Sequence, residues 1–151
     1  MSKRGTFLVT AADEDSAVLR DVAAGQVHAL ASNPDVEEGD VLDATIAPEP
    51  PLEVTWTVED VTARRSVTVE RVDERPDERA REAAADLDVG EIATLESHAG
   101  ETHVIAVSPE RTAAAADEVA ADDGTQERAA SLGAERVSVR AADGVVSVRY
   151  R

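Results

Sequence analysis

Apolar and polar residues alternate along short stretches of this chain, and turn residues separate the stretches. In residues 52–59 the apolar side chains are Leu52, Val54, Trp56 and Val58, with a polar residue after each. Because successive side chains of a strand point to opposite faces, this pattern predicts a β-strand whose buried face includes Trp56. Similar runs predict strands at residues 5–10, 16–22, 26–30, 41–47 and 66–72.

Six strands without a helix between them constrain the fold of the first half. They favour a small antiparallel β-barrel or a strongly curled sheet, which we assign to an all-β domain over residues 1–74. A domain of about 75 residues buries little surface, so we expect the two halves to pack on each other or on a second copy of the chain. A homo-oligomer is therefore one of the expected arrangements.

The periodicity changes after residue 74, where the spacing of alanines indicates helices. Pro76 with the acidic residues after it favours one helix start, and Ser108 followed by proline favours another. We expect hairpins over residues 91–107 and 135–151. The sequence therefore predicts an α+β domain over residues 75–151, in the order helix, hairpin, helix, helix, hairpin. Its antiparallel sheet is expected to have helices on one face.

Charge is the second constraint. The chain has 32 Asp and Glu residues against 15 Lys and Arg, which gives a net charge of −17. Repulsion among these charges destabilises a compact chain at low ionic strength, whereas at about 1 M salt the screening length falls to about 3 Å. This composition is typical of cytoplasmic proteins of extreme halophiles, so we expect a salt-adapted, cytoplasmic protein.

Residue types that the chain lacks exclude several functions. The absence of cysteine excludes disulfides, thiol catalysis and cysteine-ligated zinc or iron–sulfur sites. No run approaches the ~18 apolar residues of a membrane span, and no signal peptide is apparent. Lys3 is the single lysine, at an end of the chain expected to be mobile, so no phosphate-loop or Schiff-base lysine is expected. We therefore predict no enzymatic activity, no cofactor and no membrane partner.

Arginine is unevenly distributed on the last predicted hairpin. With Asp143 and Gly144 as a two-residue loop, alternation separates Val137, Val139, Ala141, Val146, Val148 and Tyr150 from the opposite face, which has Arg136, Ser138, Arg140, Ser147, Arg149 and Arg151. Guanidinium groups bind carboxylates and phosphates through paired hydrogen bonds. Arg136, Arg140, Arg149 and Arg151 are therefore a candidate surface for an acidic protein or a nucleic-acid backbone. The alternative is that they pair with the chain's own carboxylates.

A second candidate site lies at the tip of the earlier hairpin. If Ala99 and Gly100 form its loop, Glu96, His98, Glu101 and His103 share one face near the tip. Two imidazoles and two carboxylates are suitable ligands for Zn²⁺, Mn²⁺ or Ni²⁺. A register slip of one residue would separate these pairs, and the alternative is a solvated hairpin tip.

Several segments also resemble a known family. They are residues 5–10, 17–21, 25–28, 39–42, 48–51 and 53–56. Through them the chain resembles an uncharacterised protein family of halophilic archaea over most of its length. No activity accompanies this resemblance, so it implies no functional residues.

Three functions stay open. The first is a non-enzymatic binding or adaptor protein that contacts its partner through the terminal arginines. The second is a nucleic-acid-associated protein that uses residues 5–72 as an oligonucleotide-binding-like barrel, although only Phe7, Trp56 and Tyr150 are available for stacking on bases. The third is a metal-dependent activity at the tip over residues 96–103.

Overall fold

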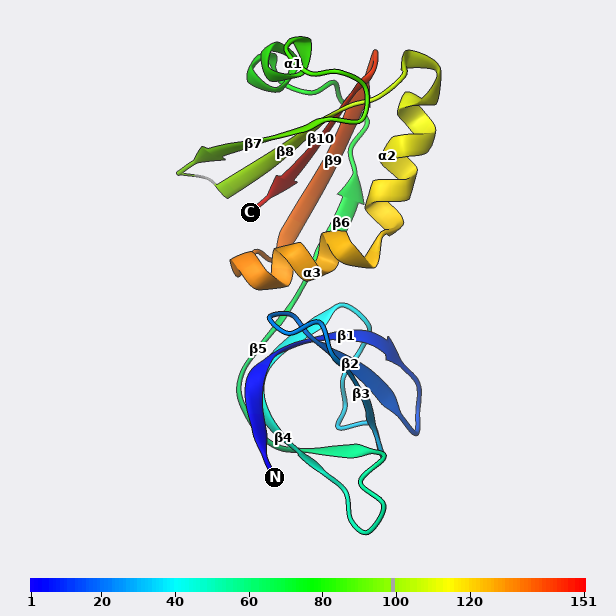
Figure 1. The fold of residues 1–151 in the computed structure, drawn as a ribbon, viewed down its shortest axis with the longest axis vertical. Coiled ribbons are helices and arrows are strands. Elements are labelled where there is room, and N and C mark those ends of the chain that lie inside the picture. Colours follow the sequence, from blue (N-terminus) through cyan, green and yellow to red (C-terminus); the bar gives the residue numbers. More distant parts are fainter. Residues whose placement is uncertain (99) are drawn as a thin grey trace. The chain divides into compact units, whose positions relative to one another are not determined.

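The computed structural model describes residues 1–98 and 100–151 (Figure 1). This part of the chain has ten strands and three α-helices, so the α+β class that the sequence predicts is confirmed. The chain forms two compact units. The first contains residues 1–67 and 126–133, and the second contains residues 68–125 and 134–151.

The first unit has five strands that pair in a closed ring. Their order is β1-β2-β3-β5-β4, and β4 pairs with β1. Neighbours are antiparallel except β3 and β5, which share one parallel pair at Leu30 and Trp56. A curled sheet of short strands is therefore present, as predicted. The strands are β1 (Lys3–Ala12), β2 (Ala17–Asp21), β3 (Val27–Leu30), β4 (Asp40–Pro48) and β5 (Trp56–Ser66).

The inward side chains of this ring form its hydrophobic core. Phe7, Leu19 and Ile46 have no exposed surface, and Trp56 and Val58 pack against them. Strand pleat brings every second residue to the inside, which is why the alternating pattern predicted this core. Each fully buried side chain of this size stabilises the folded state by about 1.5–3 kcal/mol relative to the exposed side chain.

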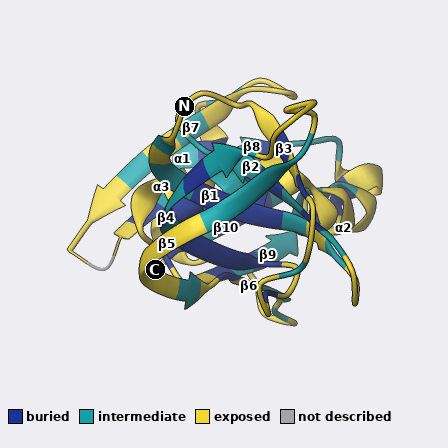
Figure 2. Ribbon diagram, turned by 90° about the horizontal axis from the view of Figure 1, so that it is seen from below, coloured by how far each residue is buried: buried dark blue, intermediate teal, exposed yellow. Residues whose placement is uncertain are grey.

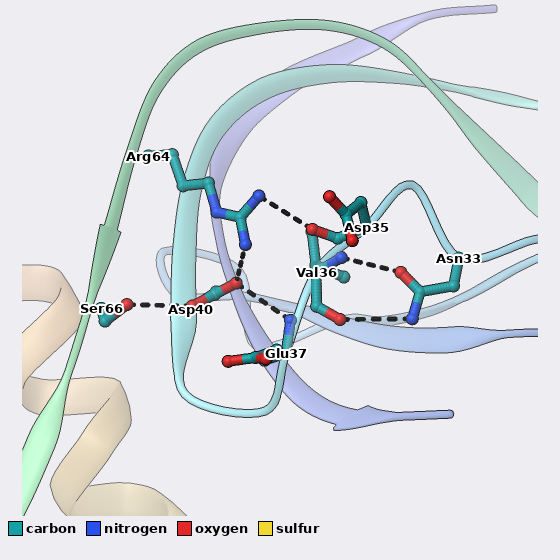
Figure 3. A network of polar contacts seen from close by, with 7 residues as sticks. All are labelled: Asn33, Asp35, Val36, Glu37, Asp40, Arg64 and Ser66. Carbon is teal, nitrogen blue, oxygen red and sulfur yellow. Dashed lines mark hydrogen bonds and ion pairs between the residues drawn. The ribbon is translucent and has the colours of Figure 1, made fainter. Parts of the chain in front are cut away.

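The loop between β3 and β4 is held by buried polar contacts (Figure 3). The carboxylate of Asp40 is buried and accepts hydrogen bonds from the Arg64 guanidinium (2.7 Å), the Ser66 hydroxyl (3.0 Å) and the Glu37 backbone N–H (2.9 Å). Asn33 adds two hydrogen bonds to the backbone of the same loop. Because three donors fix its first residue, β4 begins at a defined position.

The strand predicted at residues 52–59 begins only at Trp56. Leu52 and Val54 are 77% and 73% exposed. The prolines before them have no N–H to donate to a neighbouring strand, and the N–H of Glu53 donates instead to the carbonyl of Glu49 (3.0 Å) within a turn. The prediction was therefore wrong for residues 52–55 and right for the inward position of Trp56.

The second unit is a five-stranded sheet with helices. The strand order is β6-β9-β10-β8-β7. The strands are β6 (Thr68–Arg71), β7 (Ile92–Ser97), β8 (Gly100–Ala106), β9 (Arg136–Ala142) and β10 (Val145–Tyr150). The helices are α1 (Glu78–Ala85), the 3₁₀ helix η1 (Pro109–Arg111), α2 (Thr112–Ala121) and α3 (Asp123–Leu132), and most of α3 belongs to the first unit.

Strand β6 belongs to the second sheet, although the sequence predicted residues 66–72 as the last strand of the first half. It pairs in parallel with β9, with Val69 opposite Val137. The boundary between the two units therefore lies after Val67, whereas the sequence predicts it after residue 74. The sheet is mixed rather than wholly antiparallel. Parallel pairing joins strands that are far apart in the chain, so no local sequence pattern indicates it.

Helices α1 and α2 pack on opposite faces of this sheet, whereas the sequence predicted helices on one face. Ala80 and Ala84 of α1 cluster with Val104 of β8. On the other face, Asp117 of α2 binds Arg71 of β6 at 3.0 Å, and Figure 2 shows that much of α2 is exposed. Strands β8 and β9 run in the same direction, and connections between such strands are in general right-handed, which restricts the face that the helix between them covers.

Candidate functional site

The terminal hairpin has the register that the sequence predicts. Strands β9 and β10 pair around the loop 143–144, with Arg140 opposite Ser147 and Ser138 opposite Arg149. The φ angles of the two loop residues are 48° and 84°, in the left-handed region that a two-residue Asp-Gly hairpin turn requires. The predicted separation into two faces is therefore confirmed.

One face of this hairpin is core and the other carries the arginines. Val137, Val139, Val146, Val148 and Tyr150 are at most 4% exposed. We call the opposite side the arginine face; it consists of Arg136, Ser138, Arg140, Ser147, Arg149 and Arg151. Helix α1 packs on this same face, against Val104 and Val145 near the hairpin loop, where Ser147 is buried. Towards the other end, Arg149 is half-buried and Arg136 and Arg151 are exposed.

Two of the four arginines are paired with carboxylates. Arg136 lies 3.0 Å from Glu70, and Arg140 lies 3.4 Å from Glu74. Exposed pairs of this kind contribute between zero and about 1 kcal/mol. Within residues 1–98 and 100–151, no carboxylate forms an ion pair with Arg149 or Arg151. Internal pairing therefore accounts for two arginines of the face and leaves two cations open.

The hairpin of β7 and β8 has a different register from the predicted one. Glu96 lies opposite Glu101, and Thr94 lies opposite His103, whereas the predicted loop would pair Glu96 with His103. Ala99, one of the two residues of that predicted loop, lies outside the described residues. The partner of Glu96 is two residues away from the predicted one, a shift that keeps Glu96, Glu101 and His103 on one face of the hairpin.

The metal site predicted at Glu96, His98, Glu101 and His103 is not assembled. His98 lies in an exposed turn rather than on the strand face. Nε2 of His103 lies 2.8 Å from Oε2 of the buried Glu101, and the His103 ring lies 5.0 Å from that of Tyr150. In the part of the chain that the structure describes, no three His, Asp or Glu residues are grouped to hold a metal ion.

A polar cluster that the sequence did not predict lies at one end of the ring. Nζ of Lys3 lies 2.8 Å from Oδ2 of Asp21, 2.7 Å from Oε1 of Gln26 and 3.1 Å from Nε2 of His28. These contacts use all three N–H donors of the ammonium group, so Nε2 of His28 accepts and its imidazole is neutral. Lys3 is therefore held in strand β1, contrary to the expected mobile terminus. The alternation of side chains could have predicted this position, because Lys3 and the buried Phe7 lie four residues apart and therefore on the same side of strand β1.

The surroundings of this cluster favour a neutral histidine and an ionised aspartate. Burial lowers the pKa of His28, and the charge of Lys3 lowers it further against the opposing effect of Asp21. Burial by itself raises the pKa of Asp21, but hydrogen bonds from Lys3 and from the backbone N–H groups of Ala24 and Ala23 outweigh it and hold that pKa below its usual value. Lys3 lies in β1, Asp21 in β2 and His28 in β3, so the contacts of Lys3 link these three strands.

The outside of the ring offers little to a nucleic acid. Phe7 is fully buried, and its ring lies 6.1 Å from that of His28, which in turn lies 4.5 Å from Trp56. Oligonucleotide-binding barrels use the β2–β3 face and the β1–β2 and β4–β5 loops. Here the β1–β2 loop carries acidic residues at 13–15. The aromatic rings therefore serve the core, and the loop repels phosphates.

Comparison with known proteins places the chain in a family. The model of a family of unknown function, DUF5812, matches residues 3–141, which include strands from both units. No curated protein and no solved structure matches the chain. In the described residues, no helix has the length and apolar composition needed to cross a membrane. The chain therefore belongs to DUF5812, a family of unknown function.

Proposed function

We propose that this protein is a non-enzymatic binding or adaptor protein that docks an acidic partner protein through the arginine face. One observation carries the proposal: Arg149 and Arg151 have no carboxylate partner among the described residues, although the chain has a net charge of −17. In a chain with such a surplus of carboxylates, an arginine on a sheet face is expected to form an ion pair with one of them. Within the described part of the chain Arg149 and Arg151 form no such pair, so both are available to a partner.

The arginines that are already paired add to this surface. Glu70 and Glu74 are exposed partners held by single contacts, and exposed pairs of this kind exchange at little cost. A partner carboxylate that receives two parallel hydrogen bonds from Arg136 or Arg140 forms the stronger contact. Docking therefore extends from the two open cations to the whole arginine face.

The composition supports a salt-rich cytoplasm as the setting. Fourteen of the 15 basic residues are arginine, against 32 acidic residues. At about 1 M salt the screening length of about 3 Å removes long-range attraction and leaves direct contacts. Paired guanidinium hydrogen bonds act at that range, which makes arginine the suitable cation for such a surface.

Binding of a fluorescent acidic peptide, with alternating Glu and Gly residues, tests the proposal. We expect Arg140→Glu/Arg149→Glu to weaken binding by about tenfold or more at 1 M KCl, because two attractive contacts become repulsive. The control Arg4→Glu/Arg81→Glu makes the same change in net charge at exposed positions outside the arginine face. Equal losses in the two variants would contradict docking at the arginine face.

The nucleic-acid alternative has one observation in its favour, the closed ring of five short strands. Filter binding of single-stranded RNA over a KCl series tests it, because phosphate contacts weaken steeply with salt. RNA binding that is insensitive to Arg140→Glu/Arg149→Glu would favour the ring over the arginine face. The metal-dependent alternative has no ligand set in the described residues.

A further inference from the structure

Three polar side chains form a row across the middle of the arginine-bearing side of the sheet. Strand register places Arg149 of β10 directly opposite Ser138 of β9 on one side and Thr102 of β8 on the other. Side chains that are directly opposite on antiparallel strands have Cβ atoms about 4.5–5.5 Å apart. All three residues are half-buried. The row therefore places one arginine side chain between two side chains that carry hydroxyls.

The row has unused hydrogen-bonding capacity. Among the described residues, the hydroxyls of Thr102 and Ser138 and the guanidinium of Arg149 have no side-chain hydrogen bond or ion pair. Arg136 and Arg140 lie two residues to either side of Ser138 on the same face of β9. The row thus combines a partly accessible arginine with two hydroxyl-bearing neighbours, and two further arginines flank it.

The donor set matches a phosphate better than a carboxylate. A guanidinium presents a fork of two parallel N–H donors, and the two hydroxyls add one donor each. A carboxylate has two oxygens, which the fork alone satisfies. A phosphate monoester has three terminal oxygens and a charge of about −1.5 to −2 at pH 7, so it uses the hydroxyl donors as well. Its larger charge also displaces the exposed glutamates from Arg136 and Arg140.

We propose that the row Thr102, Arg149, Ser138 binds the phosphate of a phosphorylated serine or threonine in a partner protein. This inference rests on the proposed function and specifies the acidic group that the arginine face recognises. The row lies on a strand surface with further arginines along it, at positions 136, 140 and 151. A phosphate carried by a polypeptide gains contacts with these arginines, which a free phosphate ion does not reach.

Three fluorescent peptides, identical except for a central phosphoserine, glutamate or serine, test the inference on the full-length protein by anisotropy at 1 M KCl. We expect the phosphoserine peptide to bind about tenfold or more tightly than the glutamate peptide. Thr102→Val/Ser138→Ala removes this preference and leaves binding of the glutamate peptide unchanged. The control Thr94→Val/Ser131→Ala, at exposed hydroxyls outside the row, keeps the preference.

The other outcomes separate the two proposals. Equal affinity for the phosphoserine and glutamate peptides overturns the phosphate site and leaves the acidic-partner proposal standing. Absence of binding to either peptide overturns both. A phosphate preference that survives in Thr102→Val/Ser138→Ala overturns the row as the site. Displacement of the peptide by inorganic phosphate at an equal concentration overturns a phosphorylated protein as the ligand.

Discussion

Nζ of Lys3 lies 3.1 Å from Nε2 of His28, so the single lysine of the chain donates a hydrogen bond to its buried histidine. This contact requires a neutral imidazole, because a protonated ring has no lone pair to accept and repels the ammonium group. Asp21, the other charged neighbour of both side chains, already accepts from Lys3 and from two backbone N–H groups. The protonation state of His28 is therefore linked to the stability of the ring.

Lowering the pH from about 7.5 to about 5.5 is expected to destabilise the folded protein through His28. Its folded pKa lies below the ordinary value of 6.5, so the unfolded chain binds the proton more readily. The stability that the neutral His28 contributes is fully present above about pH 6.5 and is lost as the pH falls towards the folded pKa. Urea-unfolding midpoints at the two pH values measure it.

Two variants isolate this contribution from the protonation of surface carboxylates. His28→Gln is expected to lose a clear part of the pH dependence, whereas His98→Gln, in an exposed turn, keeps it. A His28→Gln protein with the unchanged pH dependence of the parent would refute the link.

Arg64→Met is expected to destabilise the first unit by about 1–3 kcal/mol, because it leaves the buried carboxylate of Asp40 without its cation. The hydrogen bonds from Ser66 and Glu37 remain and limit the loss. Denaturation at constant salt measures the change in the free energy of unfolding. The control Arg81→Met, at an exposed residue of α1, is expected to stay within about 0.5 kcal/mol. A loss in Arg64→Met no larger than in the control would contradict this role.

Gly100→Ala is expected to destabilise the second unit by more than about 2 kcal/mol. Gly100 has a φ of 130°, and a Cβ there would overlap the carbonyl oxygen of Tyr150. Gly25→Ala is a matched control, since Gly25 has a φ of 73° and open space around it, and backbone strain alone costs about 1 kcal/mol. Thermal unfolding measures the loss of stability in both variants. Equal losses would argue against a close approach between Gly100 and the carbonyl oxygen of Tyr150.

Leu52→Asp is expected to change the free energy of unfolding by less than about 0.5 kcal/mol, because Leu52 is exposed in a turn. Val58→Asp, two positions into β5 where the side chain packs against the core, is expected to cost more than about 1 kcal/mol, since it brings a charge to the core. A large loss in Leu52→Asp would restore the strand that the alternating pattern predicts for residues 52–55.

Local patterns of the sequence determined much of the fold. The Asp143-Gly144 turn set the register of the terminal hairpin, because a two-residue loop with left-handed φ angles permits one pairing. Alternation then assigned the buried valines and the arginine face. The ring of short strands and the start of β4 after Gly39 also followed from turn residues and strand pleat.

Only the tertiary structure decided the pairings that join distant segments. The parallel pairing of β6 with β9, the position of α2 and the assignment of residues 126–133 to the first unit have no local signal. The pairing of β8 with β10 brings Gly100 close to Tyr150, which lies fifty residues away in the sequence. The Lys3, Asp21 and His28 cluster and the row of Thr102, Arg149 and Ser138 each combine three strands. Side-chain periodicity is a property of one strand, whereas these sites arise from contacts between strands, which form only when the whole chain packs.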